Sequence, residues 1–199
     1  METANKRRMG FALCGSFCTF SRVIETVAAL AADGWNVTPV MSFQSASTDT
    51  RFGTAEDFRA ALTEICGQPI VDTIAAAEPI GPKKRFDVLV VAPATGNTLA
   101  KIAAGIADTP VTLAVKSHLR NNRPVVVAVS TNDGLGGNAA NIGALMARKH
   151  LFFVPFGQDD PAGKPNSLVA DFSRIGETAE AALNGEQLQP ILLGTEKKS

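Results

Sequence analysis

The chain has 199 residues, of which 45% are hydrophobic and 19% are charged, and its formal net charge is zero. This hydrophobic content supports a sizeable core and argues against a disordered chain. The zero net charge argues against nucleic acid or an anionic membrane as a bulk partner. The length suits a single domain, which we expect over residues 1–187, followed by a tail at 188–199.

The sequence shows no membrane span, secretory signal or metal-binding pattern. No apolar run approaches the roughly 20 residues that cross a bilayer, and the start METANKRRM has charge but no apolar signal core. The three cysteines, Cys14, Cys18 and Cys66, form neither an even-numbered disulfide set nor the CxxC spacing of a zinc site. We therefore expect a cytoplasmic protein without a bound metal.

Apolar strands alternate with amphipathic helices along the whole chain. Strands are expected at residues 9–14, 36–42, 69–74, 86–93, 123–130 and 151–156; helices are expected at 22–32, 54–67, 98–108, 111–120, 138–150 and 167–183. Continuous Val, Ile, Leu and Ala strands joined by helices predict a doubly wound, mostly parallel α/β sheet that is flanked by helices on both faces. Such a fold binds ligands at the carboxyl ends of its strands.

The residues that follow four of these strands are rich in hydroxyls, amides and glycines. These segments read CGSFCTFS, SFQSASTDTR, APATGNT and STNDGLGGNAAN. The first has neither GxGxxG spacing nor the Lys of a triphosphate-binding loop. Its Ser16 and Thr19 surround the start of a helix, where free N–H groups and the helix dipole favour an anion. We expect a single phosphate group to bind there.

The motifs of several common enzyme classes are missing. The chain has two histidines, His118 and His150, with no Ser-His-Asp ordering, no HExxH motif and no acid pair at glycosidase-like spacing. The catalytic residues are therefore unknown at this stage. A polar, uncharged ring system that carries one phosphate suits this edge of the sheet better than a metal or a triphosphate.

The segment PATGNTLAKIAAGIAD (93–108) resembles the Pro-Ala-Ser-Ala-Asn-Thr signature of the homo-oligomeric flavin-containing cysteine decarboxylase superfamily, and also the matching segment of flavin prenyltransferases. The resemblance implies FMN on a Rossmann-like or flavodoxin-like flavoprotein sheet, in a homo-oligomer with the flavin near an intersubunit contact. The positions that match, and that we expect to bind the cofactor, are Gly15, Ser16, Thr19, Ser42, Thr95, Gly96, Asn97 and Thr98. Asn132 falls near the substrate-recognition loop.

Two departures from these relatives concern catalysis. The superfamily's decarboxylases carry a histidine between the second helix and the fourth strand, whereas residues 67–86 here contain none. The prenyltransferases need an Arg-Glu pair after the fifth strand, where this chain has STND. Neither reaction is supported residue by residue.

A narrower resemblance, to the family of dipicolinate synthase B subunits, rests on TDTRFG, AEPIGPKK, STNDGLGGNAANIG and FFVPFGQDDPAGKPNSLVADF. It implies a sporulation protein that acts with the dipicolinate synthase A subunit to form pyridine-2,6-dicarboxylate from a dihydrodipicolinate-type intermediate of lysine synthesis, in an oxidoreductase reaction. Two alternatives stay open. One is an FMN-dependent decarboxylase of the same superfamily, and the other is a non-catalytic flavin-fold scaffold for the A subunit.

A dicarboxylate substrate requires fixed cations, and an arginine fork binds a carboxylate through two hydrogen bonds. Arg51 lies in the loop after the second strand, and Lys116 and Arg120 are four residues apart on one helical face. We expect these three side chains, together with Asn132, to bind substrate. His118 points away from that cationic face, as a hydrogen-bond donor or a surface residue.

Overall fold

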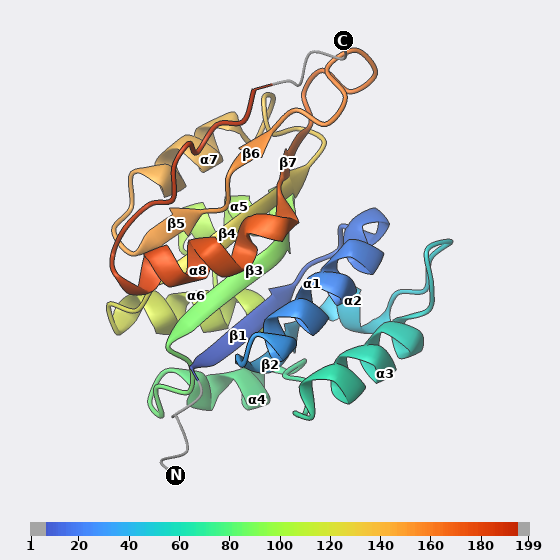
Figure 1. Cartoon of the computed structure of the whole chain (residues 1–199), viewed down its shortest axis with the longest axis vertical. Helices are drawn as coiled ribbons and strands as arrows, with labels where there is room; N and C mark the ends of the chain where they lie inside the picture. The colour runs from blue at the N-terminus through green and yellow to red at the C-terminus, as the bar shows by residue number, and fades with distance from the viewer. Residues whose placement is uncertain (1–6, 195–199) are drawn as a thin grey trace.

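The computed structural model describes residues 7–194, and its strands form one sheet in the order β2-β1-β3-β4-β7-β6, with β5 paired to β4 (Figure 1). The strands are β1 (Arg8–Leu13), β2 (Asn36–Met41), β3 (Val88–Ala94), β4 (Val125–Thr131), β5 (Leu151–Phe153), β6 (Phe156–Gly157) and β7 (Leu168–Ala170). The pairs among β1 to β5 are parallel, and β7 runs antiparallel to β4 and β6. This confirms the doubly wound, mostly parallel sheet, with its switch point between β1 and β3.

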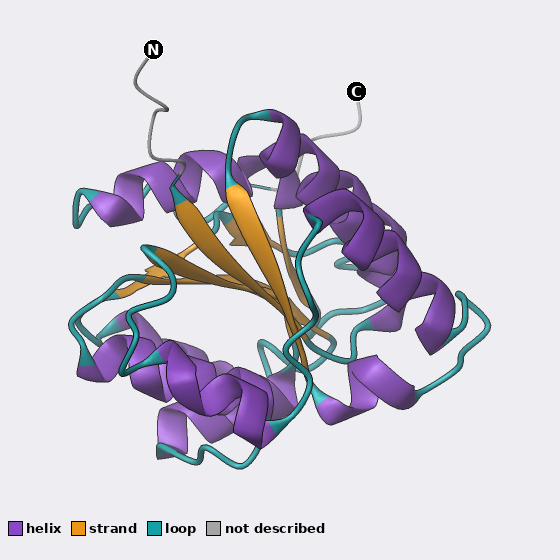
Figure 2. Cartoon of the chain, turned by 90° about the horizontal axis from the view of Figure 1, so that it is seen from below, coloured by secondary structure: helices purple, strands orange, loops and turns teal. Residues whose placement is uncertain are grey.

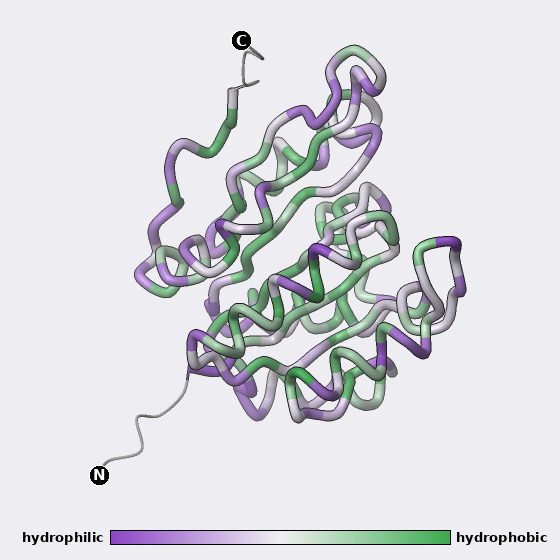
Figure 3. Tube along the Cα trace, turned by 45° about the vertical axis from the view of Figure 1, so that its right-hand side comes forward, coloured by the Kyte–Doolittle hydropathy of each residue, from purple (hydrophilic) through white to green (hydrophobic). Residues whose placement is uncertain are grey.

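Helices lie on both faces of the sheet (Figure 2). They are α1 (Phe20–Ala32), α2 (Phe43–Ser47), α3 (Ala55–Cys66), α4 (Ile74–Ala77), α5 (Gly96–Ala104), α6 (Pro110–Arg120), α7 (Ala139–Met146) and α8 (Ile175–Leu183), with 3₁₀ turns at Phe17–Thr19, Glu78–Ile80 and Phe172–Arg174. Every residue of β3 and β4 is buried. Strands covered on both faces carry continuous apolar runs, and in Figure 3 the central strands are mainly hydrophobic.

Capping residues set the helix boundaries. Thr54 accepts a hydrogen bond from the Asp57 backbone N–H at 3.1 Å and so caps α3, at the start of the helix expected over 54–67. Gly105 adopts φ 75°, a left-handed conformation that ends α5, and Thr109 then caps α6. Ile106, which follows this turn, is 47% exposed.

Two expected elements were wrong. Residues 69–74 form no strand, and only Val71 makes an isolated bridge to Val40. The segment 167–183, expected to be one helix, instead begins with strand β7, and its helix α8 begins only at Ile175. The polar turn after Gly157 reverses the chain and returns it against β4. There Leu168 and Val169 pair with Thr131 and Ser130.

The expected tail at 188–199 is described as far as residue 194. Ile191 accepts a hydrogen bond from the Phe156 N–H at 3.0 Å, and the Leu193 N–H donates to the Phe156 carbonyl at 2.9 Å. This part of the segment is therefore attached to β6. Residues 1–6 and 195–199 lie outside the described residues.

His118 is buried within α6 rather than at the surface, with 2% of its area exposed. Its Nδ1 lies 3.3 Å from the Pro124 carbonyl oxygen, its Nε2 has no partner among the described residues, and its ring packs on Phe86. Burial lowers the pKa of His118 to about 4; the Pro124 carbonyl and Asp87 oppose this shift, and Arg123 adds to it. The neutral ring is therefore the form that packs in the core.

This burial predicts a pH dependence of stability. The unfolded chain has a histidine pKa of about 6.5, so between that value and the folded one the unfolded state binds more protons. The free energy of unfolding should fall as the pH drops from 7 to 4, with a His118 contribution on the order of 3 kcal/mol. Urea unfolding of the wild type and of His118→Asn should give curves that converge toward pH 4. Parallel curves would contradict this assignment.

Candidate functional site

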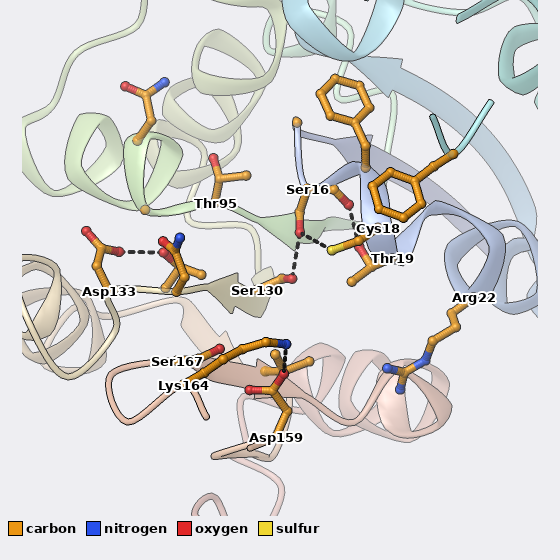
Figure 4. Close-up of a pocket in the computed structure, with 18 of the residues that line it drawn as sticks. Ser16, Cys18, Thr19, Arg22, Thr95, Ser130, Asp133, Asp159, Lys164 and Ser167 are labelled. Carbon is orange, nitrogen blue, oxygen red and sulfur yellow. Dashed lines mark hydrogen bonds and ion pairs between the residues drawn. The ribbon is translucent and has the colours of Figure 1, made fainter. Parts of the chain in front are cut away.

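A cleft of about 1030 Å³ opens at the carboxyl end of the sheet (Figure 4). It lies at the switch point and is walled by the loops after β1, β3 and β4, by the loop between α2 and α3, and by the segment between β6 and β7. Its volume is that of a site for a cofactor-sized molecule. The sequence-predicted residues that line it are Gly15, Ser16, Thr19, Arg51, Thr95, Gly96, Asn97 and Asn132.

The loop after β1 is a compact turn that presents hydroxyl and amide groups. The Ser16 N–H donates to the Cys14 carbonyl at 2.8 Å, and the Thr19 hydroxyl donates to the Ser16 carbonyl at 2.7 Å. The Ser16 hydroxyl lies 2.9 Å from the hydroxyl of Ser130, at the end of β4. The first N–H groups of the 3₁₀ turn, those of Phe17 and Cys18, have no acceptor among the described residues, as expected at a helix start.

The loop after β3 places a second helix start at the same cleft. Thr95 is the N-cap of α5 and accepts a hydrogen bond from the Thr98 N–H at 3.4 Å. The N–H groups of Gly96 and Asn97, in the first turn of α5, therefore have no partner within the helix. The positive end of the α5 dipole adds to their attraction for an anion or a polar ring edge.

The loop after β4 is fixed beneath α5 by the carboxylate of Asp133. Thr131 donates its hydroxyl to Asp133 Oδ1 at 2.5 Å, and Asn138 donates its amide to Oδ2 at 2.7 Å. A Cβ at Gly96 would lie 2.4 Å from Asn138 Nδ2 and 2.8 Å from Asp133 Oδ1. A side chain at position 96 would therefore require the hydrogen-bonded side chains of Asn138 and Asp133 to shift.

A smaller cavity of about 290 Å³ adjoins the cleft and shares Gly15, Thr95 and Asn97 with it. It contains the remaining two predicted cofactor residues, Ser42 and Thr98. Ser42 caps α2, accepting from the Ser45 N–H at 3.2 Å. All eight residues that were predicted to bind the cofactor therefore lie on two adjacent cavities.

The predicted substrate residues separate into two groups. Arg51 and Asn132 line the cleft, and the Arg51 guanidinium lies 4.8 Å above the centre of the Phe52 ring. Lys116 and Arg120 line a different cavity of about 290 Å³ between α5 and α6, together with Ile106 and Arg148. The structure therefore does not bring Lys116 and Arg120 to the cleft.

The predicted site residues leave out several polar side chains that line the cleft, among them Arg22, Ser130, Asp159 and Lys164. Burial raises the pKa of Asp159, but hydrogen bonds from Ser167 and Lys164 outweigh it and hold the pKa below its ordinary value. Asp159 in turn raises the pKa of Lys164, so that Lys164 remains charged. The sequence signal for Asp159 and Lys164 was the polar run after Gly157. That run could be assigned to the cleft only if β7 was known to pair with β4, because this pairing places the run beside the other loops.

The thiols differ in their environments. Cys14 is buried, and burial raises its pKa to about 11 although contacts with Thr98 and Thr95 oppose the shift. Cys14 therefore packs as a neutral thiol, whereas Cys18 is exposed in the cleft. Within residues 7–194, no three His, Cys, Asp or Glu side chains gather to hold a metal ion, and no helix there is long and apolar enough to cross a membrane.

A family model described as Flavoprotein matches residues 1–155, so the chain belongs to the flavoprotein family, whose cofactor class is a flavin. Within that family it belongs with the dipicolinate synthase B subunits. It is 46% identical to the dipicolinate synthase B subunit of Bacillus subtilis (strain 168) over 193 residues, which cover 97% of this chain and 96% of that protein.

Solved structures agree with this placement. The crystal structure of the dipicolinate synthase B subunit from Bacillus halodurans C matches with a TM-score of 0.87 and 46% identity, covering 95% of this chain and 97% of that one. The FMN-dependent cysteine decarboxylase SpaF matches with a TM-score of 0.68 at 24% identity, covering 89% of this chain and 97% of that one. The second likeness shows that the fold is shared.

The contact between Gly96 and the Asp133 loop gives a test of the cleft. Gly96→Ala should lower the free energy of unfolding by about 1–3 kcal/mol, because the added methyl displaces Asn138 and Asp133. Gly137→Ala is the matched control, since its Cβ would lie 3.7 Å from Asp133 Oδ2 in ordinary contact. Urea unfolding measures both, and equal midpoints for the two variants would rule out the close contact.

Proposed function

We propose that this chain is the B subunit of a dipicolinate synthase, which binds FMN in the cleft and acts with the A subunit to form pyridine-2,6-dicarboxylate during sporulation. The observation that carries the proposal is the cleft itself, where two helix starts and a hydroxyl-rich rim lie with Arg51, a cation without a carboxylate partner among the described residues. The 46% identity to a named B subunit over nearly the whole chain supports it.

The residues that face the cleft suit an FMN molecule. Ser16 and Thr19, with the free N–H groups of the 3₁₀ turn, would hold the phosphate. Thr95, Gly96, Asn97 and Thr98 would hold the flavin ring through the first turn of α5, and Ser42 would contribute a hydroxyl from the adjoining cavity. The glycine at position 96 lets the Asp133 loop close beneath that turn.

The proposed reaction aromatises a dihydropyridine dicarboxylate by removing two electrons and two protons. When bound, a flavin supplies an acceptor for a hydride. The A subunit resembles, at family level, a nicotinamide-dependent partner, so the electrons could instead leave through that partner. In either case Arg51 and Asn132 of this chain orient the substrate, with Arg51 binding one carboxylate.

Homo-oligomer formation is part of the proposal. The surface that carries α5 and α6 includes the exposed Ile106 beside a largely apolar cavity, and small residues along α5 permit close packing. A homo-oligomer could use this face and bring a neighbouring copy near the cleft.

Substitution of Ser16 tests the phosphate site. Ser16→Asp places a carboxylate beside the 3₁₀ turn, and we expect it to raise the Kd for FMN at least about tenfold through repulsion of the phosphate. Titration followed by flavin fluorescence measures the Kd. Ser47→Asp on exposed α2 is the control and should bind as the wild type does. An unchanged Kd for Ser16→Asp would place the phosphate elsewhere.

Substitution of Arg51 tests the substrate clamp. With the A subunit present, we expect Arg51→Ala to reduce dipicolinate formation at limiting substrate about tenfold or more, because a charge-assisted pair is lost. Arg51→Lys should recover little, since the ammonium cannot replace the two-pronged fork. Arg85→Ala is the matched control. The Arg85 guanidinium also stacks on the phenylalanine that follows it in the sequence, 5.6 Å from the centre of the Phe86 ring. Full activity in Arg51→Ala would exclude the clamp.

A further inference from the structure

The cleft contains five charged side chains, and its acids are already engaged. They are Arg22, Arg51, Lys164, Asp133 and Asp159. Asp133 accepts hydrogen bonds from Thr131 and Asn138, and Asp159 pairs with Lys164 Nζ at 3.1 Å. Among the described residues, neither Arg22 nor Arg51 has a carboxylate partner. The balance of charge in the cleft therefore favours an anionic ligand.

A flat dicarboxylate needs cations from two directions. Arg51 approaches from the loop between α2 and α3, and Lys164 approaches from the segment between β6 and β7. Figure 4 shows the Lys164 ammonium directed into the cleft, on the side where Ser130 lies. Arg22 is less suited, because its side chain also lines a second cavity beside α8.

The backbone around Lys164 is fixed although its side chain is exposed. The Lys164 N–H donates to the Asp160 carbonyl at 2.7 Å, and the Ser167 N–H donates to the Lys164 carbonyl at 3.0 Å. Gly163 donates its N–H to Asp160 Oδ1 at 2.9 Å, and Gln158 donates its amide to the Pro165 carbonyl at 2.8 Å. The segment therefore holds the base of the Lys164 side chain in place while its ammonium remains free to change partner.

The present partner of Lys164 is easily replaced. The Lys164 and Asp159 side chains are 59% and 33% exposed, and an ion pair of this kind contributes little to stability. A lysine ammonium has three donors and no fixed plane, so a ligand carboxylate can take the place of Asp159 without rearrangement of the backbone. Asp159 would then act as a competitor for the cation.

We propose that Lys164 binds the second carboxylate of the substrate, opposite Arg51, and that Asp159 occupies this position when no ligand is bound. The inference deepens the proposed function and rests on it for the class of substrate. According to this inference, Lys164 makes the site prefer a dicarboxylate to a monocarboxylate. It also predicts that removing the charge of Asp159 strengthens binding, the reverse of the effect expected for a purely structural ion pair.

Calorimetric titration of the FMN-saturated protein with pyridine-2,6-dicarboxylate and with pyridine-2-carboxylate tests this. Lys164→Gln should raise the Kd for the dicarboxylate about tenfold and leave the Kd for the monocarboxylate nearly unchanged, so that the preference is lost. Asp159→Asn should lower the Kd for the dicarboxylate several-fold. Lys149→Gln, at an exposed position outside the cleft, should match the wild type.

The outcomes separate this inference from the proposed function. If the wild type binds FMN but not the dicarboxylate, the proposed substrate fails and the role of Lys164 fails with it. If the wild type binds the dicarboxylate and Lys164→Gln binds it equally well, only the role of Lys164 is overturned. Weaker binding by Asp159→Asn would overturn the competition between the ligand and Asp159. The FMN Kd of each variant, measured separately, should equal that of the wild type.

Discussion

The parallel pairing of β1 with β3 is the constraint on which the site depends. Met9 to Ala12 pair in register with Val88 to Val91, so the two strands end at the same edge of the sheet. Their following helices lie on opposite faces, and the two loops therefore diverge around a gap. The hydroxyl turn after β1 and the first turn of α5 face each other across it. The third loop, after β4, closes the base through Asp133 and requires glycine at position 96.

Much of this arrangement could be predicted because it follows from local patterns. Buried strands such as 86–93 are continuous apolar runs, and turn residues directly after them must lie at one edge of a parallel sheet. The helix expected from residue 54 begins there as α3, with Thr54 as its N-cap. Residues could be predicted to bind the cofactor because they follow these strands and match a known signature. The cleft then contains six of those eight residues, with Ser42 and Thr98 next to it.

The features that could not be predicted from the sequence depend on contacts between segments that are distant in the chain. β7 has three residues and lies within an apparently helical pattern, and its pairing with Ser130 and Thr131 of β4 leaves no local periodic signal. Without β7, the polar segment that carries Asp159 and Lys164 could not be located. Lys116 and Arg120 were correctly placed on one helix, but the position of α6 relative to the cleft is a tertiary property. The burial of His118 likewise depends on Phe86 and Pro124, from other elements.

A chain with zero net charge can nevertheless attract an anion when its charges are separated locally. Here two helix starts, Arg51 and Lys164 line one cleft, an arrangement that suits the phosphate-bearing cofactor and the dicarboxylate of the proposed function. The most direct test of the central claim is reconstitution, with dipicolinate measured for the isolated A subunit, for this chain alone, and for the two together with FMN. The account predicts dipicolinate only from the combination, with loss of activity in Ser16→Asp. Equal formation by the isolated A subunit, or decarboxylation by this chain alone, would contradict it.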